Sequence, residues 1–580
     1  MRRFVENPIH RALNLQDEQF GSFYLELDKD DRLYVRELIS HLPRAIQSYL
    51  ISDYNAKNTR FEANTCIRTT TEEINKIIPK VLLKHFDAGE EDLRLLAKDC
   101  AESCHYLLRQ TIHYKAFTFV TKKETDVSAA LRIDSCESEF LFSDSSVNAS
   151  TRSDTIVLSY EKCANFVRGN GITPPKPSKK LTFDGCLKRM LDEVWWLRKL
   201  RCVLRRSTEQ VMIYLNKVNR VKGIYCSDWT AKNRRFQKSH QLESLKKILM
   251  TNELGEQFTL YDIYEKGVSN PINRRNELMT RMHGFEELSK EHGHLGIFVT
   301  LTCPSKYHRA YSRSGGENPK WNGATPHDSQ QYLCTTWARI RAEFNRKNIR
   351  LYGLRVSEPQ HDGTPHWHLM IFVEAHQLES CKVIIEQYSL EEDGDEPGAK
   401  ENRVKFVDID PKKGSATGYV AKYVSKNIDG ANLDEGIYGE NPIEGAERVE
   451  AWASCWGIRQ FQQLGGVSVT VWREMRRLKK LFDKDEKLQQ IHQSADQGKW
   501  GIFVTLMGGV FSKRKDQLVR PYYDFEVNKD TGAIKANLFD GIPIFKLKGI
   551  FYKGKEIITR VHQWRIEKIA APFSSSLGVL

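Results

Sequence analysis

The segment PHWHLMIFV at residues 365–373 constrains the fold most strongly, because it is an apolar strand that contains two histidines. Side chains alternate between the two faces of a strand, so His366 and His368 project from the same side. A buried strand does not place two imidazoles side by side without polar partners. The pattern therefore predicts a strand within a sheet, where two rings on one face hold a single cation.

The residues around this strand predict a domain in which strands and helices alternate. In order, they indicate a strand at 296–302, a helix at 326–347, strands at 350–357 and 365–373, a helix at 375–388, a strand at 403–410 and a helix at 413–427. This order indicates an α+β fold with a central antiparallel sheet and helices packed on one face. The sequence GIFVTL occurs at 296–301 and again at 501–506, and we expect the second copy to be another strand.

With 580 residues, the chain is too long for one hydrophobic core, so we expect several domains. The expected regions are a helical N-terminal domain of unknown role (1–130), a linker or loop region (131–180), a basic helical region (181–290), the sheet domain with the histidine pair (291–430), a basic helical extension (431–484) and a small β-rich C-terminal domain (485–580). The Ser/Asp-rich stretch 135–154 is typical of an exposed linker. One helix is expected to carry Leu187, Met190 and Trp195 on its apolar face.

The composition is that of a folded protein with an excess of positive charge. Lys and Arg exceed Asp and Glu by 88 to 75, which favours a polyanionic partner. No apolar run reaches the roughly 20 residues that span a bilayer, and the two N-terminal arginines precede no apolar segment, so we expect neither membrane insertion nor secretion. The 12 cysteines are scattered and indicate reduced thiols of a cytosolic protein. The basic run 228–248 predicts either a solvated surface or a DNA contact.

A carboxylate near the histidine pair would complete a metal site. Glu358 ends the strand before His366, and a hairpin between the two strands would place these residues side by side. Two nitrogens and a carboxylate suit Mg²⁺ or Mn²⁺, and such an ion polarises a phosphate oxygen. His361 is the rival third ligand, and the alternative for Glu358 is an exposed residue of the hairpin.

The segment GYVAKYVSKN at 418–427 supplies candidate nucleophiles. On a helix, Tyr419 and Tyr423 are four residues apart and share a face, together with Lys422 and Lys426. Nearby ammonium groups or a metal would stabilise a phenolate, and the lysines are equally suited to hold a phosphate. In isolation, such a tyrosine pair is ordinary helix packing.

Taken together, these motifs resemble those of a known enzyme class. The strand TLT (300–302), the HWH strand with Glu358 upstream and the helix YVAKY resemble the three ordered motifs of the His-hydrophobic-His (HUH) rolling-circle replication endonucleases. RVSEPQHDGTPHWHLMIF and GYVAKYVSKNID are similar, more closely, to the replication gene A proteins of temperate tailed phages. The resemblance implies that His366 and His368 bind the metal and that Tyr419 and Tyr423 become linked to DNA.

The expected function is site-specific nicking of one DNA strand to start rolling-circle replication. A tyrosine attacks the phosphate, the 3′-hydroxyl leaves as a primer, and the enzyme stays on the 5′ end as a phosphotyrosine. No GxxxxGK[ST] signature is present, so we expect no ATPase, and the resemblance implies a host helicase and polymerase as partners in the cytoplasm of a bacterial host. Alternatives are a conjugative or transposition-type HUH nickase and a non-catalytic origin-binding protein. A phosphohydrolase that uses the HxH pair is a further alternative. Histidine-triad hydrolases have a third alternating histidine, however, and Met370 occupies that position here.

Overall fold

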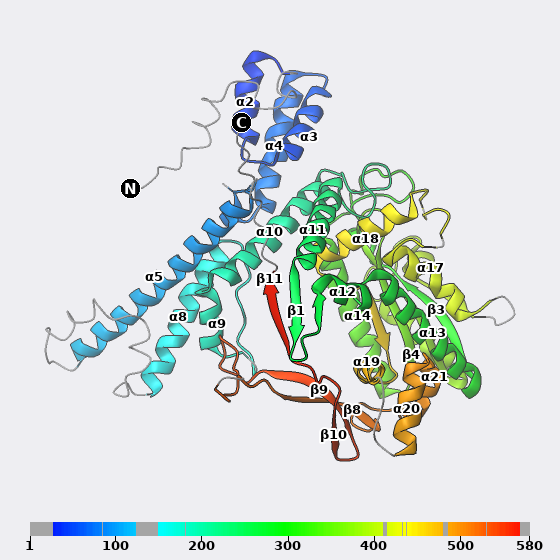
Figure 1. Ribbon diagram of the computed structural model, residues 1–580. Helices are drawn as coiled ribbons and strands as arrows, with labels where there is room; N and C mark the ends of the chain where they lie inside the picture. Colours follow the sequence, from blue (N-terminus) through cyan, green and yellow to red (C-terminus); the bar gives the residue numbers. More distant parts are fainter. Residues whose placement is uncertain are drawn as a thin grey trace, which may run out of the picture. The chain divides into compact units, whose positions relative to one another are not determined.

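The computed structural model describes residues 27–122, 149–409, 414–478 and 485–568, apart from Lys84, Asp87, Lys180, Asn432, Ile437, Lys529 and Asp530. The chain divides into two compact units (Figure 1). The first unit comprises 1–212 and 525–544, and the second comprises 213–524 and 545–580. Most of the linker expected at 135–154 lies outside the described residues.

Helices build the first unit, as expected for the N-terminal region. They are α2 (Lys29–Ile39), α3 (Arg44–Asn55), α4 (Arg60–Ile77), the short η3 (Lys80–Leu82), α5 (Glu90–Lys122), α8 (Ala149–Gly169), α9 (Phe183–Met190) and α10 (Glu193–Tyr214), whose last two residues belong to the second unit. Two expectations here are wrong. Helix α8 occupies residues 149–169 of the region 131–180, which was expected to be a linker or loop. The expected helix around Leu187 breaks after Met190, so that Trp196, not Trp195, is fully buried.

The second unit contains the sheets and the remaining helices. Its elements are α11 (Asp228–Lys246), β1 (Ile248–Asn252), β2 (Gln257–Thr259), α12 (Leu260–Lys266), α13 (Pro271–His292), β3 (His294–Leu301), η5 (Ser305–Tyr307), α14 (Pro326–Arg346), β4 (Leu351–Pro359), β5 (Pro365–Glu374), η6 (Ala375–Gln377), α15 (Leu378–Leu390), α16 (Ala399–Arg403), β6 (Val404–Asp408), α17 (Ala416–Ile428), α18 (Pro442–Trp456), β7 (Phe461–Leu464), α19 (Val469–Arg477), α20 (Glu486–Asp496), α21 (Trp500–Leu506), β8 (Val519–Phe525), β9 (Phe545–Tyr552), β10 (Lys555–Ile558) and β11 (Trp564–Lys568).

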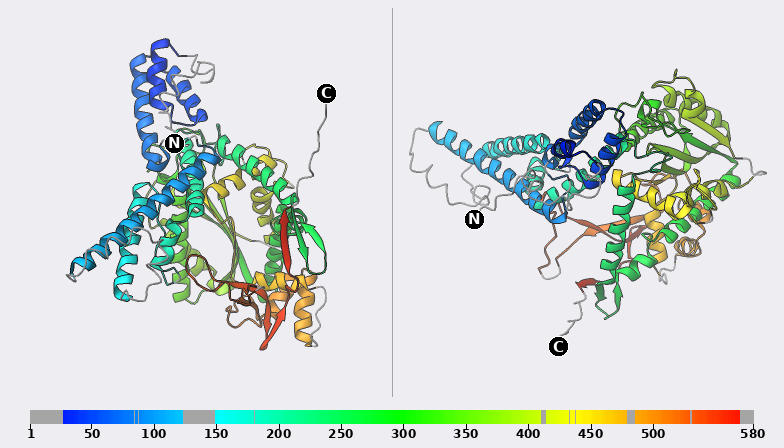
Figure 2. Two further views of the ribbon diagram at one scale, coloured as in Figure 1. Left: turned by 60° about the vertical axis from the view of Figure 1, so that its left-hand side comes forward. Right: turned by 90° about the horizontal axis from the view of Figure 1, so that it is seen from above.

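The largest sheet is five-stranded, in the order β6-β3-β5-β4-β7, and every neighbouring pair is antiparallel. The α+β fold with a central antiparallel sheet is therefore confirmed. Its strands can be followed in Figure 2 among the green and yellow helices that pack on them. Two smaller three-stranded sheets have the orders β11-β1-β2 and β10-β9-β8.

Helices cover both faces of the central sheet, so the expectation of helices on one face is wrong. On one face, Ile297, Leu369 and Ile371 form a core with α14 and α15. On the other, alternate residues such as Phe298 and Met370 form a core with α13, α17 and the helices α19 to α21. Because side chains alternate along each strand, His366 and His368 share the second face with Met370 and project toward α17.

The two copies of GIFVTL adopt different structures, so the strand expected at 501–506 is wrong. The first copy lies in β3, whereas the second forms most of α21. Trp500 precedes the second copy and lies on the same helical face as Phe503 and Val504, which are also buried. Trp500, just outside the repeat, thus extends the helical apolar stripe that Phe503 and Val504 form within it. Helices α20 and α21 occupy the start of the region 485–580, which was expected to be β-rich, and its strands begin only at Val519.

Candidate active site

A hairpin brings the candidate carboxylate to the histidines. β4 and β5 pair so that Glu358 lies directly opposite His366, and the turn between them closes with a hydrogen bond from the Gln360 amide to the Thr364 carbonyl. Gly363 has a φ of 81°, which glycine adopts without strain. The hairpin register therefore places Glu358 inside the sheet, where it is fully buried, and it is not an exposed turn residue.

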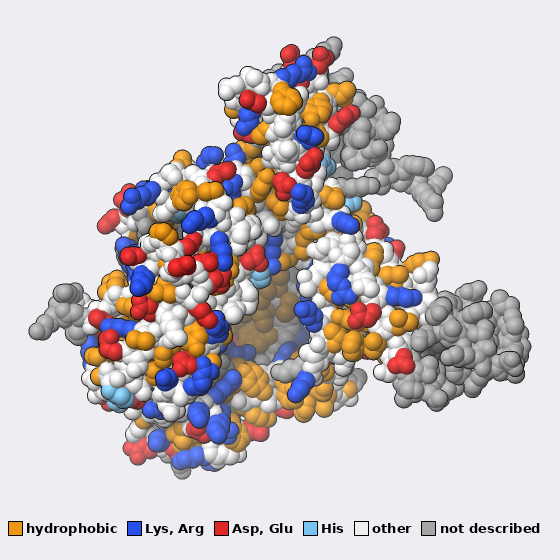
Figure 3. All heavy atoms as spheres, turned by 180° about the vertical axis from the view of Figure 1, so that it is seen from behind, with side chains coloured by type: hydrophobic (Ala, Val, Ile, Leu, Met, Phe, Trp, Pro, Cys, Tyr) orange, Lys and Arg blue, Asp and Glu red, His pale blue; other side chains and the backbone are white. Residues whose placement is uncertain are grey.

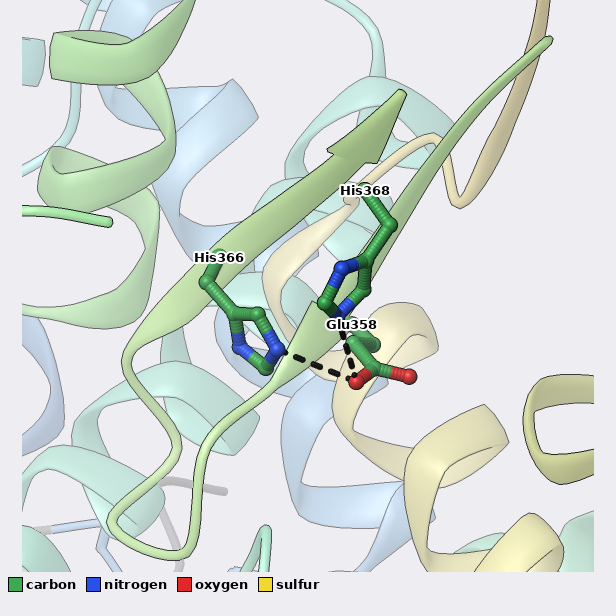
Figure 4. A group of neighbouring side chains, drawn as sticks. All are labelled: Glu358, His366 and His368. Carbon is green, nitrogen blue, oxygen red and sulfur yellow. Dashed lines mark hydrogen bonds and ion pairs between the residues drawn. The ribbon is translucent and has the colours of Figure 1, made fainter. Parts of the chain in front are cut away.

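Glu358, His366 and His368 form a compact donor group (Figure 4). Oε1 of Glu358 lies 3.0 Å from Nε2 of each imidazole. The second oxygen, Oε2, accepts a hydrogen bond of 2.7 Å from the Asn427 side-chain amide, and Lys426 Nζ lies 3.3 Å from Oε1. Within the described ranges, this is the one group of three His, Cys, Asp or Glu side chains whose ligand atoms all lie within 4.8 Å of one another.

The charges around Glu358 keep it ionised. Burial by itself would raise the pKa of this carboxyl, but Lys426 and the two imidazoles outweigh that effect and hold the pKa well below its ordinary value. His366, in contrast, is uncharged at neutral pH, because burial and the neighbouring His368 lower its pKa to about 4. At neutral pH the group is therefore a carboxylate with a neutral His366, the protonation states that bind a metal.

The donor group fits a divalent cation. Ligand atoms about 2.1 Å from an ion and at right angles to each other are about 3 Å apart, and this spacing matches the Glu358–imidazole distances. The Thr300 hydroxyl lies 3.1 Å from Nδ1 of His368, which fixes that ring with Nε2 toward Glu358. Nδ1 of His366 is buried and has no hydrogen-bond partner among the described residues.

The rival ligand, His361, is not part of this group. It lies in the hairpin turn, and its ring packs near Tyr438 with the ring centres 6.0 Å apart. Burial lowers its pKa, and the adjacent Asp362 opposes this effect. The arrangement favours Glu358 over His361 as the third ligand.

The two tyrosines lie on α17, beside the donor group. The Tyr423 ring stacks on Phe298 at 5.0 Å, and its centre lies 4.1 Å from that of His368. Tyr419 packs edge-on against Phe298 but is 41% exposed. Burial, Tyr419 and Glu358 together raise the pKa of Tyr423. Only one of the two phenols thus lies against the imidazoles in this structure.

A cavity of about 580 Å³ opens onto the donor group. Glu358, both histidines, Tyr423 and Lys426 line it, together with polar residues of the loops after β3, β4 and α15. Tyr419 and Lys422 are not among the described residues that line it, and Lys422 is exposed. The structure therefore brings five of the seven candidate residues together at one cavity.

Sequence reasoning missed several residues that shape this site. Asn427 orients Glu358, and Phe298 provides the surface on which both tyrosine rings pack. Asp362 is buried in the hairpin turn and pairs with His308 at 3.1 Å, which lines the same cavity. Asn427 is the last residue of the motif GYVAKYVSKN, so its place beside the tyrosines could have marked it as a site residue. No local sequence pattern marks His308.

Comparison with known proteins places this chain in a family. Residues 111–431, more than half of the chain, match the family described as bacteriophage replication gene A protein (GPA). The chain belongs to this family. The replication gene A protein of Escherichia phage 186 is 40% identical over 411 residues, covering 68% of this chain and 58% of that protein.

Two other curated relatives match over a similar share of the chain. The replication protein of Haemophilus phage HP1 is 36% identical over 67% of this chain and 50% of its own length. A probable replication endonuclease from a prophage-like region of Salmonella typhimurium is 34% identical over 65% and 48%, respectively. The chain thus spans about half the length of these curated relatives. No solved structure matches the chain. Among the described helices, none combines the length and apolar character needed to cross a membrane.

Proposed function

We propose that this chain is a metal-dependent, site-specific endonuclease and strand transferase that nicks one DNA strand to start rolling-circle replication. The observation that carries the proposal is the single Glu358 oxygen 3.0 Å from both imidazole nitrogens, in the same cavity as Tyr423. Family membership supports DNA as the substrate, because curated relatives are named replication gene A protein and probable replication endonuclease.

Glu358, His366 and His368 would hold Mg²⁺ or Mn²⁺. The bound ion would supply positive charge that polarises a phosphate oxygen of the scissile phosphodiester. The chain's own contribution is to orient the ligands. Thr300 fixes the His368 ring, and Asn427 fixes the Glu358 carboxylate. Lys426 lines the cavity, so we assign it the role of stabilising the negative charge that develops on the phosphate.

Tyr423 is the nucleophile of the first attack. Its oxygen bonds to phosphorus, the bond from phosphorus to the 3′-oxygen breaks, and that oxygen takes up a proton to become the 3′-hydroxyl primer. The 5′ end stays esterified to the tyrosine, which conserves the energy of the phosphodiester for rejoining. Because the pKa of Tyr423 is raised, its phenol carries a proton at neutral pH in the metal-free site, and this proton leaves during the attack.

Tyr419 carries out the second strand transfer, when the replication fork returns to the origin. A tyrosine already esterified to the old 5′ end cannot attack again, and the ring centres of Tyr419 and Tyr423 are 6.3 Å apart. Lys422 is exposed, and we assign it the role of binding the DNA strand outside the cavity. Unwinding and synthesis would come from a host helicase and polymerase, in the host cytoplasm.

A conjugative or transposition-type nickase would share this chemistry, and family membership favours replication. A non-catalytic origin-binding protein is distinguished by experiment. The protein is incubated with labelled origin DNA and Mg²⁺ or Mn²⁺, and the covalent adduct is mapped to its tyrosine. We expect an adduct at Tyr423. Salt-dependent binding without nicking or adduct would refute the proposed activity.

A further inference from the structure

A second feature of the second unit is a concentration of positive charge in its C-terminal elements. The segments 469–478, 508–524 and 545–560 contain twelve Lys and Arg and four Asp and Glu, a net charge of +8 out of +13 for the whole chain. Figure 3 shows Lys and Arg side chains gathering at the lower left of that view, over elements drawn at the lower right of Figure 1. This charge lies outside the active-site cavity, whose lining residues end at Tyr438.

Ion pairs with acidic groups hold the elements of this surface together. Arg560 on the segment after β10 pairs with buried Glu474 on α19 at 2.8 Å. Lys553, in the turn between β9 and β10, pairs with Asp485 just before α20 at 2.9 Å. These acidic groups are therefore occupied by structural contacts and do not neutralise the remaining cations.

Of these twelve Lys and Arg, six have no acidic partner in the part of the chain that the structure describes, and we call them the C-terminal basic surface: Arg476, Lys513, Arg514, Lys515, Arg520 and Lys548. All are exposed except Lys548, which is half-buried. Exposed cations without acidic partners on one unit create a positive potential that attracts a polyanion.

Two hydrogen bonds hold the backbone that carries Lys513, Arg514 and Lys515. The Asp516 amide donates to the Lys513 carbonyl at 2.8 Å and closes a turn around the three cations. The next residue, Gln517, accepts a hydrogen bond of 3.2 Å from the amide of Ser468, the residue that caps α19. Three consecutive cations thus lie in one hydrogen-bonded turn, which reduces the conformational entropy that this segment loses when it binds a partner.

The other basic segment, 228–248, differs in this respect. On α11, Arg234 pairs with Glu450 at 2.6 Å and Arg235 pairs with Glu447 at 2.8 Å, both acids belonging to α18. Two of its arginines therefore serve to join helices. The two uses expected for this segment were a solvated surface and a DNA contact, and neither describes these two arginines, which join α11 to α18.

We propose that the C-terminal basic surface binds the phosphate backbone of duplex DNA beside the nicking site. The proposal rests on the proposed function for the choice of DNA as the polyanion. Duplex is favoured over single strand because the Arg520 guanidinium covers the Phe551 ring, 5.1 Å from its centre, and occupies a face on which a base would stack. The surface and the cavity belong to one unit, joined at the edge of the central sheet by a hydrogen bond from Gly466 to Val510.

The test uses the full chain with Lys513, Arg514 and Lys515 all changed to Gln. Its matched control changes Lys232, Lys247 and Lys347 to Gln, which removes the same charge from exposed positions elsewhere in the unit. Affinity for a 30-base-pair duplex without an origin is measured between 50 and 200 mM salt, without added metal. We expect the slope of log affinity against log salt to fall by up to about 2.7, at about 0.9 per lost phosphate contact, and the control to fall by less than one.

Metal-dependent cleavage of a short single-stranded origin oligonucleotide is measured in parallel. The triple variant should cleave it at the wild-type rate, which shows that the fold is intact and separates this proposal from the proposed function. Equal loss of duplex affinity in both triple variants would show that only total charge matters and would overturn the proposal. So would an unchanged salt slope, or a larger loss for single strands than for duplex.

Discussion

Nε2 of His368 lies 3.0 Å from Oε1 of Glu358, although ten residues separate them in the chain. Antiparallel pairing of β4 and β5 brings them together, and strand alternation turns both side chains toward α17. The same oxygen is 3.0 Å from His366, so one carboxylate oxygen is shared by two imidazoles. This relationship makes the proposed metal site testable ligand by ligand.

Replacing His366 and His368 together by Ala should abolish metal-dependent cleavage while duplex DNA affinity is retained. The expected loss of rate is at least about 10³-fold, because the positive charge at the scissile phosphate is lost. Cleavage and salt-dependent binding are measured side by side on the same preparations. Wild-type cleavage by the double variant would refute the metal-site assignment.

Glu358→Ala should raise the metal concentration needed for half-maximal nicking by more than about tenfold, because it removes a ligand. His361→Ala serves as the control and should change this concentration little, since its ring packs near Tyr438. Titration with Mn²⁺ measures both variants. The opposite pattern would transfer the ligand role to His361.

Lys426→Met should separate metal binding from catalysis. Lys426 lies 3.3 Å from the Glu358 oxygen and repels a cation there, so its removal should lower the half-maximal metal concentration by about tenfold. The rate at saturating metal should fall, because the charge assigned to the phosphate is lost. Lys422→Met, at the exposed position on the same helix, is the matched control and should leave metal affinity unchanged. A Lys426 variant with wild-type rate and metal affinity would contradict both roles.

Tyr423 should carry out the first cleavage more often than Tyr419. Tyr423→Phe should slow cleavage of a single-stranded origin oligonucleotide more than Tyr419→Phe, because only Tyr423 lines the cavity. Each single variant should still form an adduct, neither should complete and recircularise a replicated strand, and the double variant should form no adduct. Phe keeps the ring packing on Phe298, so a loss reports the hydroxyl. Normal circle formation by either single variant would disprove alternating use.

Gly284→Ala should destabilise the second unit by about 1–3 kcal/mol through overpacking. A Cβ at Gly284 on α13 would lie 2.6 Å from the Gly501 nitrogen and 2.7 Å from the Trp500 Cβ on α21. Gly169→Ala is the control, since its Cβ would meet nothing within 4 Å. Thermal unfolding compares the two, and equal midpoints would show that the helices separate without strain.

The positions of the candidate site residues were largely predictable because they depend on local spacing, whereas their roles stay proposals. Strand alternation places His366 and His368 on one face, and helical spacing places Tyr419 near Tyr423, whatever the rest of the fold does. Glu358 was predictable to the extent that a short turn favours a hairpin. Lys422 and Lys426 were indistinguishable by spacing, and the tertiary structure separates them because only Lys426 faces the buried carboxylate.

The sequence by itself determined the succession of strands and helices along residues 296–427, the histidine pair and the tyrosine helix, since each depends on residues a few positions apart. Only the tertiary structure decided which partners surround them. GIFVTL is a strand between paired strands in β3 and a helix in α21, because burial against neighbours outweighs its local preference. The same holds for the second helical layer on the sheet, for Asn427 against Glu358, and for Arg234 against Glu450, since each contact joins segments that only folding brings together.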